Sequence, residues 1–332
     1  MDISSSLVAA FVGILTVVLC GYLYRRSRRP ARLKAPRGVV ILYQIGRGPR
    51  APSVSPFPMK LETFLRMHNI PYMNDHSGQF SKKGKTPWIE LDGRAIADSQ
   101  LAIEYMKTAF RLPAEAHLTL EQRAAARGFL KLTEENLYWT MCIDFFGGDL
   151  QEARRLFPYT GLKLWMTLTL LRLVIKLETW GHGIGRHSSE EVWDIAVKDM
   201  TALSDFLGTK PFLMGEEPSE VDCAVFGMLA QIYWHMQGQR HQVYMKENLP
   251  NLVDYTVRMK TKYWPDWDTI TLEGANYTND HGKLYCPEKV GTNENGNISE
   301  KVGTNDNGNF PEQVGANDNV SFSGPVGYGN NS

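Results

Sequence analysis

Cysteine is scarce in this chain, and there is no excess of charge of either sign. The four cysteines among 332 residues show no CxxC motif and no regular spacing; they are Cys20, Cys142, Cys223 and Cys286. This pattern disfavours a disulfide framework and is typical of a reducing compartment. Lys plus Arg number 36, as do Asp plus Glu, so the formal net charge is zero. A neutral chain gives no electrostatic reason to expect nucleic acid as a partner.

Motifs for metal or phosphate binding are also missing. No Cys and His residues have the spacing of a zinc site, so we expect no metal. The glycine-rich stretch GHGIGRH at 181–187 is not preceded by a strand pattern, as a phosphate-binding loop would be. We interpret it as a turn between two helices.

Charge is absent from residues 7–24, LVAAFVGILTVVLCGYLY, a run long enough to cross a bilayer as a helix. The linker that follows, 25–38, carries seven Lys or Arg residues, whereas residues 1–6 carry only Asp2. This asymmetry predicts a single-pass anchor with the N-terminus luminal or outside and the folded part cytosolic. A cleaved signal peptide would carry its positive charge before the apolar run. The basic linker can contact anionic headgroups or serve only to set the topology.

Residues 39–112 alternate between strand and helix patterns. An apolar, β-branched run begins at Val39 and predicts a buried strand. A helix follows over 57–69, and a second strand over 70–73. Asp92-Gly93 suits the turn of a β-hairpin, after which Ser99 begins a helix that ends near residue 110. The order predicts an α/β domain.

Residues 115–270 show only helical patterns. Thr119 to Gln122 forms a capping box, and Ser219 to Asp222, which also matches a capping box, begins another apolar helix. Residues 161–177 are strongly apolar but include three basic residues. We expect a buried helix of a bundle there. The alternative is a second membrane contact, which is less favourable because charges at those spacings are costly in lipid.

The chain ends in a segment, 271–332, that is rich in Asn and Gly. The sequence EKVGTNENGN at residue 288 recurs as EKVGTNDNGN at residue 300 and, degraded, from residue 312, with a period of twelve. Few apolar groups are available to offset ordering entropy, so we expect a disordered tail. Asn276, Asn297 and Asn319 begin glycosylation sequons, which a cytosolic tail would leave unused.

Several separated phrases resemble one family. PSVSPFPMKLETFLRMHNIPY, GKTPWIELDG, GHGIGR, VFGMLAQIYW and YWPDW occur in that order, and together they resemble the failed axon connections family. That family belongs to the glutathione S-transferase-like superfamily, with the metaxins and the cadmium-responsive proteins of nematodes. The resemblance covers residues 39–268. It implies an α/β thioredoxin-like N-terminal domain and an all-α GST C-terminal-like domain, here behind the single transmembrane helix.

Ser55 is the candidate catalytic residue for transferase chemistry, with Ser53 second. A hydroxyl beside a helix N-terminus can hydrogen-bond a bound sulfur and favour its thiolate. Ser55 can equally be a plain helix cap. Related members often carry Cys where this chain has Pro58, so a nucleophilic cysteine is absent at that position. Pro58 also removes an N–H donor from the first helical turn if the helix begins at Pro56.

Five further residues are candidates for holding glutathione or a similar peptide. The resemblance implies a cis peptide bond before Pro87, which turns the backbone of Thr86 toward an extended ligand. Asp98 can accept from an ammonium group, and Ser99 at its helix N-terminus can receive a carboxylate. Lys85 can meet a second carboxylate. An ordinary helix cap explains Asp98 and Ser99 equally well, and a solvated loop explains Lys85.

The resemblance implies a role in axonal development without an established catalytic activity. We therefore expect a membrane-anchored binding or scaffolding module of the transferase fold, without a cofactor. The alternative is a glutathione-dependent transferase or detoxification enzyme. A homodimer or a protein partner remains open in either case, and both functions would use the same groove.

Overall fold

The computed structural model describes residues 32–286, apart from 114, 116, 149 and 158–159. The predicted anchor at 7–24 and the twelve-residue repeats therefore lie outside the described residues. Within the described part, none of the helices combines the length and the hydropathy that crossing a bilayer demands.

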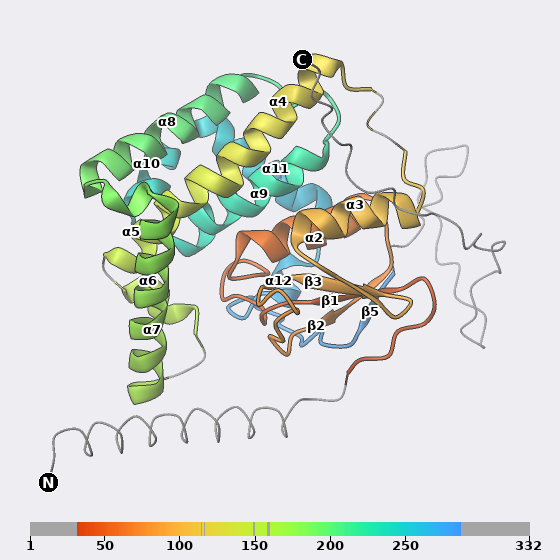
Figure 1. The fold of residues 1–332 in the computed structure, drawn as a ribbon. Helices are drawn as coiled ribbons and strands as arrows, with labels where there is room; N and C mark the ends of the chain where they lie inside the picture. Colours follow the sequence, from red (N-terminus) through yellow and green to blue (C-terminus); the bar gives the residue numbers. More distant parts are fainter. Residues whose placement is uncertain (1–31, 114, 116, 149, 158–159, 287–332) are drawn as a thin grey trace, which may run out of the picture. The chain divides into compact units, whose positions relative to one another are not determined.

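The α/β domain is built on one sheet of five short strands (Figure 1). In chain order the strands are β1 (Val40–Tyr43), β2 (Tyr72–Asp75), β3 (Trp88–Leu91), β4 (Arg94–Ala97) and β5 (Leu284–Tyr285). Their spatial order is β4-β3-β1-β2-β5, in which β1 and β2 are parallel and the other neighbours antiparallel. The predicted hairpin is confirmed: Asp92 and Gly93 join β3 to β4, and both have positive φ.

Helices α2 (Pro56–Met67) and α3 (Ser99–Ala109) cover one face of the sheet (Figure 1). Their apolar side chains, among them Leu61, Phe64 and Ile103, form a core with the strands. On the other face the rings of Tyr43 and Trp88 stack in parallel, with centroids 3.7 Å apart. Residues 33 and 35 of the predicted linker pack against this pair.

The second domain consists of helices only. In chain order they are α4 (Leu120–Lys131), η1 (Leu132–Leu137), α5 (Tyr138–Gly147), α6 (Gln151–Arg155), α7 (Gly161–His182), η2 (Ile184–Arg186), α8 (Ser189–Leu207), α9 (Glu220–Ala230), η3 (Gln231–His235), α10 (Arg240–Asn248), α11 (Pro250–Tyr263) and α12 (Trp267–Ile270). Of these, η1 and η3 are π-helical and η2 is a 3₁₀ turn. Both predicted capping boxes, at Thr119 and Ser219, are present.

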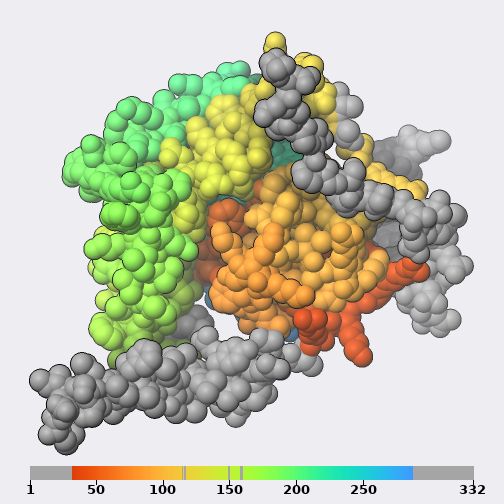
Figure 2. Space-filling model, in the orientation of Figure 1, coloured from red at the N-terminus to blue at the C-terminus, as the bar shows by residue number. Residues whose placement is uncertain are grey.

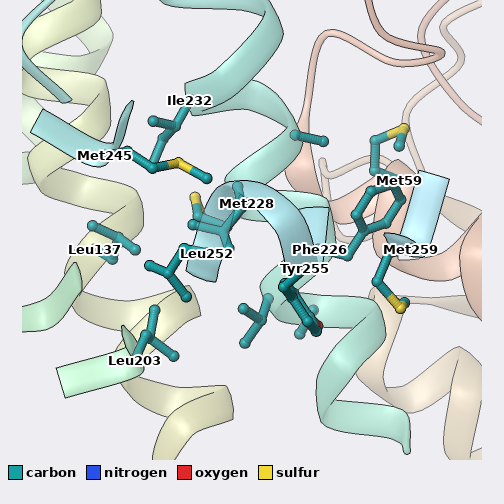
Figure 3. Close-up of a cluster of buried hydrophobic side chains, with 14 of the residues drawn as sticks. Met59, Leu137, Leu203, Phe226, Met228, Ile232, Met245, Leu252, Tyr255 and Met259 are labelled. Carbon is teal, nitrogen blue, oxygen red and sulfur yellow. The ribbon is translucent and has the colours of Figure 1, made fainter. Parts of the chain in front are cut away.

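Helix α9 lies at the centre of the core (Figure 3). All of its residues from Val221 to Ala230 are buried. Gly227 faces the start of α2, where an added Cβ would lie 2.6 Å from the carbonyl oxygen of Pro56. A glycine at this position is therefore what lets the backbones of α9 and α2 approach, which joins the two domains.

Helix α7 differs from the bundle helix that we expected over 161–177. Only Leu168 and Thr179 are buried along its 22 residues. It packs mainly against α5 and η2, and the rest of its surface, including six leucine or tryptophan side chains, is exposed. The expectation of full burial is wrong because α7 lies at the edge of the bundle (Figure 1).

Residues 271–286 differ from the disordered tail that we expected to begin at 271. Tyr285 and Leu284 in β5 pair with Tyr72 and Met73 of β2. Asp280 forms an ion pair with the buried Arg47 and a hydrogen bond with the ring of His76. Charge pairing and strand pairing therefore order a segment that has few apolar residues.

Candidate functional site

Two of the predicted ligand-binding residues, Thr86 and Asp98, lie at one edge of the sheet. Tyr43, Trp88 and Ala97 lie side by side in register across β1, β3 and β4. Thr86 comes just before this row, and its Oγ1 donates to the carbonyl of Tyr43 at 3.4 Å. Asp98 directly follows the row. The peptide bond between Thr86 and its proline is cis, as the resemblance implied.

The start of α2 offers few donors to a bound sulfur. Ser55 is the half-buried N-cap, but its side chain makes no capping hydrogen bond. Because the helix begins at Pro56, Pro58 also lies in the first turn, and two of the first three helical residues lack an N–H. Phe57 keeps its N–H there. The Ser55 hydroxyl and this one amide are what the first turn presents.

Ser53, the second hydroxyl candidate, is fully buried. Its Oγ accepts from the backbone N–H of Ser55 at 3.2 Å, and its carbonyl accepts from Nε2 of Gln231 in η3 at 3.1 Å. Ser53 therefore connects the loop before α2 to the helical domain rather than facing a ligand.

Asp98 has an unusual backbone conformation. Its φ of 89° lies in the region that non-glycine residues rarely adopt, at a cost of about 1–3 kcal/mol. Its Oδ1 accepts from the N–H groups of Gln100 and Leu101 and so caps α3. The carboxylate is exposed, and Ser99 beside it is buried. Asp98 thus serves as a cap and also presents negative charge at the edge of the sheet.

Lys60 is a buried residue of this region that the sequence did not single out. Its Nζ donates to Oε1 of Gln100 at 2.6 Å and to Oε1 of Glu134 at 2.7 Å. Gln100 in turn donates to Glu220 at the start of α9. The position of Lys60 among the apolar residues of its helix was the feature of the sequence that could have indicated its burial. Lys60 therefore connects the N-terminal halves of α2 and α3, the helices whose N-caps are Ser55 and Asp98, to the helical domain.

The remaining candidates do not add a reactive group. Lys85 is exposed in the loop before β3, where its backbone N–H donates to Ser81. Burial raises the pKa of the Cys142 thiol to about 12 and that of Cys223 well above its usual value. Both thiols therefore stay protonated at neutral pH. Among the described residues, no group of three or more His, Cys, Asp or Glu side chains could hold a metal ion.

Thr140, His241 and Asp144 in the helical domain are arranged like the hydroxyl, imidazole and carboxylate of a catalytic triad, but the hydroxyl and the imidazole are not accessible to solvent. The ring of His241 lies 3.3 Å from Oγ1 of Thr140 and 2.8 Å from a carboxylate oxygen of Asp144. Burial alone would raise the pKa of Asp144, but hydrogen bonds from His241 and Arg240 lower it. Thr140 and His241 are fully buried, so no substrate reaches them and the cluster is structural.

Two hollows in the described residues lie away from the candidate site. One, of about 160 Å³, lies between α3 and α4 and includes Gln100, Glu104 and Glu220. The other, of about 430 Å³, lies between α6 and α7. Neither is lined by Ser55, Thr86 or Asp98.

Comparison with known proteins agrees with this architecture. The family described as glutathione S-transferase N-terminal domain matches residues 56–151, and the glutathione S-transferase C-terminal domain matches residues 196–259. The isoprene-epoxide–glutathione S-transferase of Rhodococcus sp. (strain AD45) is 32% identical over 224 residues, which cover 64% of this chain and 94% of that protein. The chain is thus a glutathione S-transferase-like protein with a thioredoxin-type N-terminal domain and a helical C-terminal domain.

A second relative narrows the assignment. Failed axon connections of Drosophila melanogaster is 34% identical over 251 residues, or 70% of this chain. The match spans 60% of the length of the Drosophila protein. Metaxin-2 of Mus musculus is 23% identical over 217 residues, covering 63% of this chain and 82% of that protein. Within the superfamily, the chain belongs to the failed axon connections family.

Proposed function

We propose that this chain is a membrane-anchored, non-catalytic binding or scaffolding protein of the transferase fold, with a role in axonal development. The start of α2 carries the proposal. Transferase chemistry needs a thiolate held by a hydroxyl and by the N–H groups of the first helical turn. Here Pro56 and Pro58 remove two of those groups. The 34% identity to failed axon connections supports the axonal role.

The alternative is a glutathione-dependent transferase, which two observations favour. The chain covers 94% of a glutathione S-transferase at 32% identity. Asp98 is held in a strained conformation with its carboxylate exposed, and strain of this kind concentrates at functional sites. In this alternative Ser55 stabilises the thiolate, Thr86 binds the peptide backbone, and Asp98 and Ser99 bind its γ-glutamyl end.

Calorimetric titration of the full chain with reduced glutathione separates the two functions. We expect no heat of binding at millimolar ligand. Micromolar binding that is lost in Ser55→Ala and in Asp98→Asn would overturn the proposal. Asp98→Asn keeps an acceptor for the α3 cap and tolerates positive φ, so it removes the charge without removing the cap. Asp194→Asn, an exposed carboxylate on α8, is the matched control.

The proposed topology places residues 7–24 in a membrane, with the N-terminus luminal or outside and the folded domains cytosolic. It rests on the basic residues that follow the apolar run. Glycosylation mapping of the full chain in cells tests it. Unmodified Asn297 and Asn319 are expected, and sugar on either asparagine would place the domains in the lumen.

A further inference from the structure

Helix α7 exposes a continuous apolar surface. Of the 17 large apolar side chains that are exposed in the described residues, eight lie on this helix; they are Leu162, Trp165, Met166, Leu170, Leu173, Val174, Leu177 and Trp180. In the view of Figure 2, much of α7 (light green) lies at the molecular surface. Single exposed apolar residues are ordinary, whereas a contiguous patch marks an interaction surface.

The apolar residues of α7 form two stripes on opposite sides. The inward stripe runs from Leu164 through Leu168 to Ile175 and packs on the helical core. The outward stripe recurs every three or four residues from Leu162 to Trp180, so its members share one face. A helix that is apolar on both sides is one that is covered on both sides. The bundle covers only the inward stripe.

The surroundings of the outward stripe are basic. Between residues 151 and 186 the described chain has six Lys and Arg side chains, all exposed; they are Arg154, Arg155, Lys163, Arg172, Lys176 and Arg186. The only acidic residues there are Glu152, which pairs with Arg50 at 2.7 Å, and Glu178. The apolar surface therefore lies in a positive environment.

The hollow between α6 and α7 combines the same two chemistries. It has a volume of about 430 Å³ and is lined by apolar side chains, including Leu164 and Leu168, together with Arg154 and Arg172. Two guanidinium groups beside an apolar wall match a phosphate that carries a hydrocarbon chain. At the end of α7, the guanidinium of Arg186 lies 4.7 Å from the ring centroid of Trp180, a pairing suited to the level of lipid headgroups.

We propose that α7 docks in the plane of a bilayer that contains anionic lipids, with its outward stripe among the acyl chains and the basic residues at the headgroups. A helix of this length, about 33 Å, can lie along an interface without crossing it. For proximity the docking rests on the proposed anchoring, because the basic linker holds the folded domains within a few tens of ångströms of residues 7–24. Anchor, linker and α7 then contact one surface.

Charge favours the bilayer over other occupants. A second copy that paired through a two-fold axis would set the basic residues of one α7 against those of the other. If residues 7–24 of the same chain covered the outward stripe, the basic residues beside it would gain no partner, because residues 7–24 carry no charge. Each Lys or Arg near an anionic membrane surface strengthens binding about fivefold.

Fluorescence quenching tests the docking. The full chain is reconstituted into vesicles of phosphatidylcholine with brominated acyl chains. One preparation also contains phosphatidylserine, and the other does not. We expect bromine to quench part of the tryptophan emission, and more strongly with phosphatidylserine. Trp165→Phe/Trp180→Phe should lose most of that quenching. Trp193→Phe on α8 is the matched control and should keep it.

A charge-reversal pair provides a second readout. Arg154→Glu/Lys176→Glu should reduce the phosphatidylserine-dependent quenching at least tenfold. Lys198→Glu/Lys246→Glu, with the same change of charge on α8 and α10, should leave it unchanged. Circular dichroism of each variant establishes that it is folded.

Docking and anchoring fail in different ways. A chain that stays on the vesicles in high salt, but in which Trp165 and Trp180 are unquenched, refutes the docking and leaves the anchor standing. A chain that leaves the vesicles in high salt refutes the anchor, whatever its quenching in low salt. A dimer that Leu170→Glu/Leu177→Glu dissociates would make a second copy the occupant and overturn the inference.

Discussion

Helix α7 and the segment 271–286 differ in how their solvent exposure relates to their polarity. The helix is apolar, yet eight of its large side chains are exposed. The segment is polar, yet Asp280 keeps only 17% of its side-chain surface exposed and contacts a guanidinium, an imidazole and an amide. The difference shows that burial depends on the partner that the fold supplies. Arg47, buried beside Glu62, supplies one for Asp280, whereas the described chain supplies none for the outer face of α7.

Asp280 gives the sharpest test of this comparison. Asp280→Ala removes one of the two carboxylates that pair with the buried Arg47 guanidinium and takes away the acceptor of its Nε–H. We therefore expect a loss of about 3–5 kcal/mol in the free energy of unfolding. Glu273→Ala, which removes a half-exposed partner of Arg50 in the same segment, should cost less than about 1 kcal/mol. Urea denaturation of both variants provides the measurement. Equal losses in the two variants would mean that Asp280 contributes no more to stability than an exposed residue of the same segment.

Acid should act on the same network. Burial alone would raise the pKa of Glu62, but attraction and hydrogen bonds from Arg47 lower it to about 2. A carboxylate with a lowered pKa stabilises the fold above its unfolded pKa and loses that contribution as the pH falls through the folded value. We expect a loss on the order of 3 kcal/mol between pH 4.5 and pH 2. Glu62→Gln, less stable throughout, should show a flatter profile in urea denaturation over this range.

Two leucines of α7 test the other half of the comparison. Leu168 on the inward stripe is 4% exposed. Leu168→Ala should lower the free energy of unfolding by about 2–3 kcal/mol, because it removes apolar contacts and leaves a cavity. Thermal and urea denaturation measure this effect. A change below about 1 kcal/mol would show that the packing of α7 on the bundle is weak.

Leu170, two residues further along, is 62% exposed. Leu170→Ala should change the free energy of unfolding by less than about 0.5 kcal/mol in the absence of lipid. It is the same chemical change on the same helix, so it serves as the control for Leu168→Ala. A large effect without lipid would mean that the outer stripe is covered by protein in solution.

Local sequence patterns predicted most of the fold. The capping boxes at Thr119 and Ser219 and the Asp92-Gly93 turn act over three or four residues, and each is present where the pattern indicated it. The network around Asp280 could not be predicted, because its partner Arg47 is 233 residues away. Periodicity also could not tell α7 from α9, since both are apolar around most of their circumference and differ only in what surrounds them.

In the candidate site, too, the features encoded by short motifs were predictable and those that depend on contacts between the domains were not. Ser55, Thr86 and Asp98 follow from short motifs, and the strand register brings Thr86 and Asp98 to one edge of the sheet. The burial of Ser53 against Gln231, and that of Lys60 against Glu134, depend on how the helical domain sits on α2. No local pattern encodes that contact. Ser55, Thr86, Asp98 and Ser99 stay predictions as ligand-binding residues until glutathione is titrated.

The ion pair between Arg47 and Asp280 also bears on how the protein is made. Arg47 leaves the ribosome 233 residues before its partner, and at about 5–20 residues per second this is a delay of roughly 10 to 50 s. During that time the first domain to be synthesised has a buried arginine without its second carboxylate and a sheet without its last strand. The N-terminal domain is therefore completed last, and a nascent chain released before residue 280 would be a substrate for chaperones and proteases.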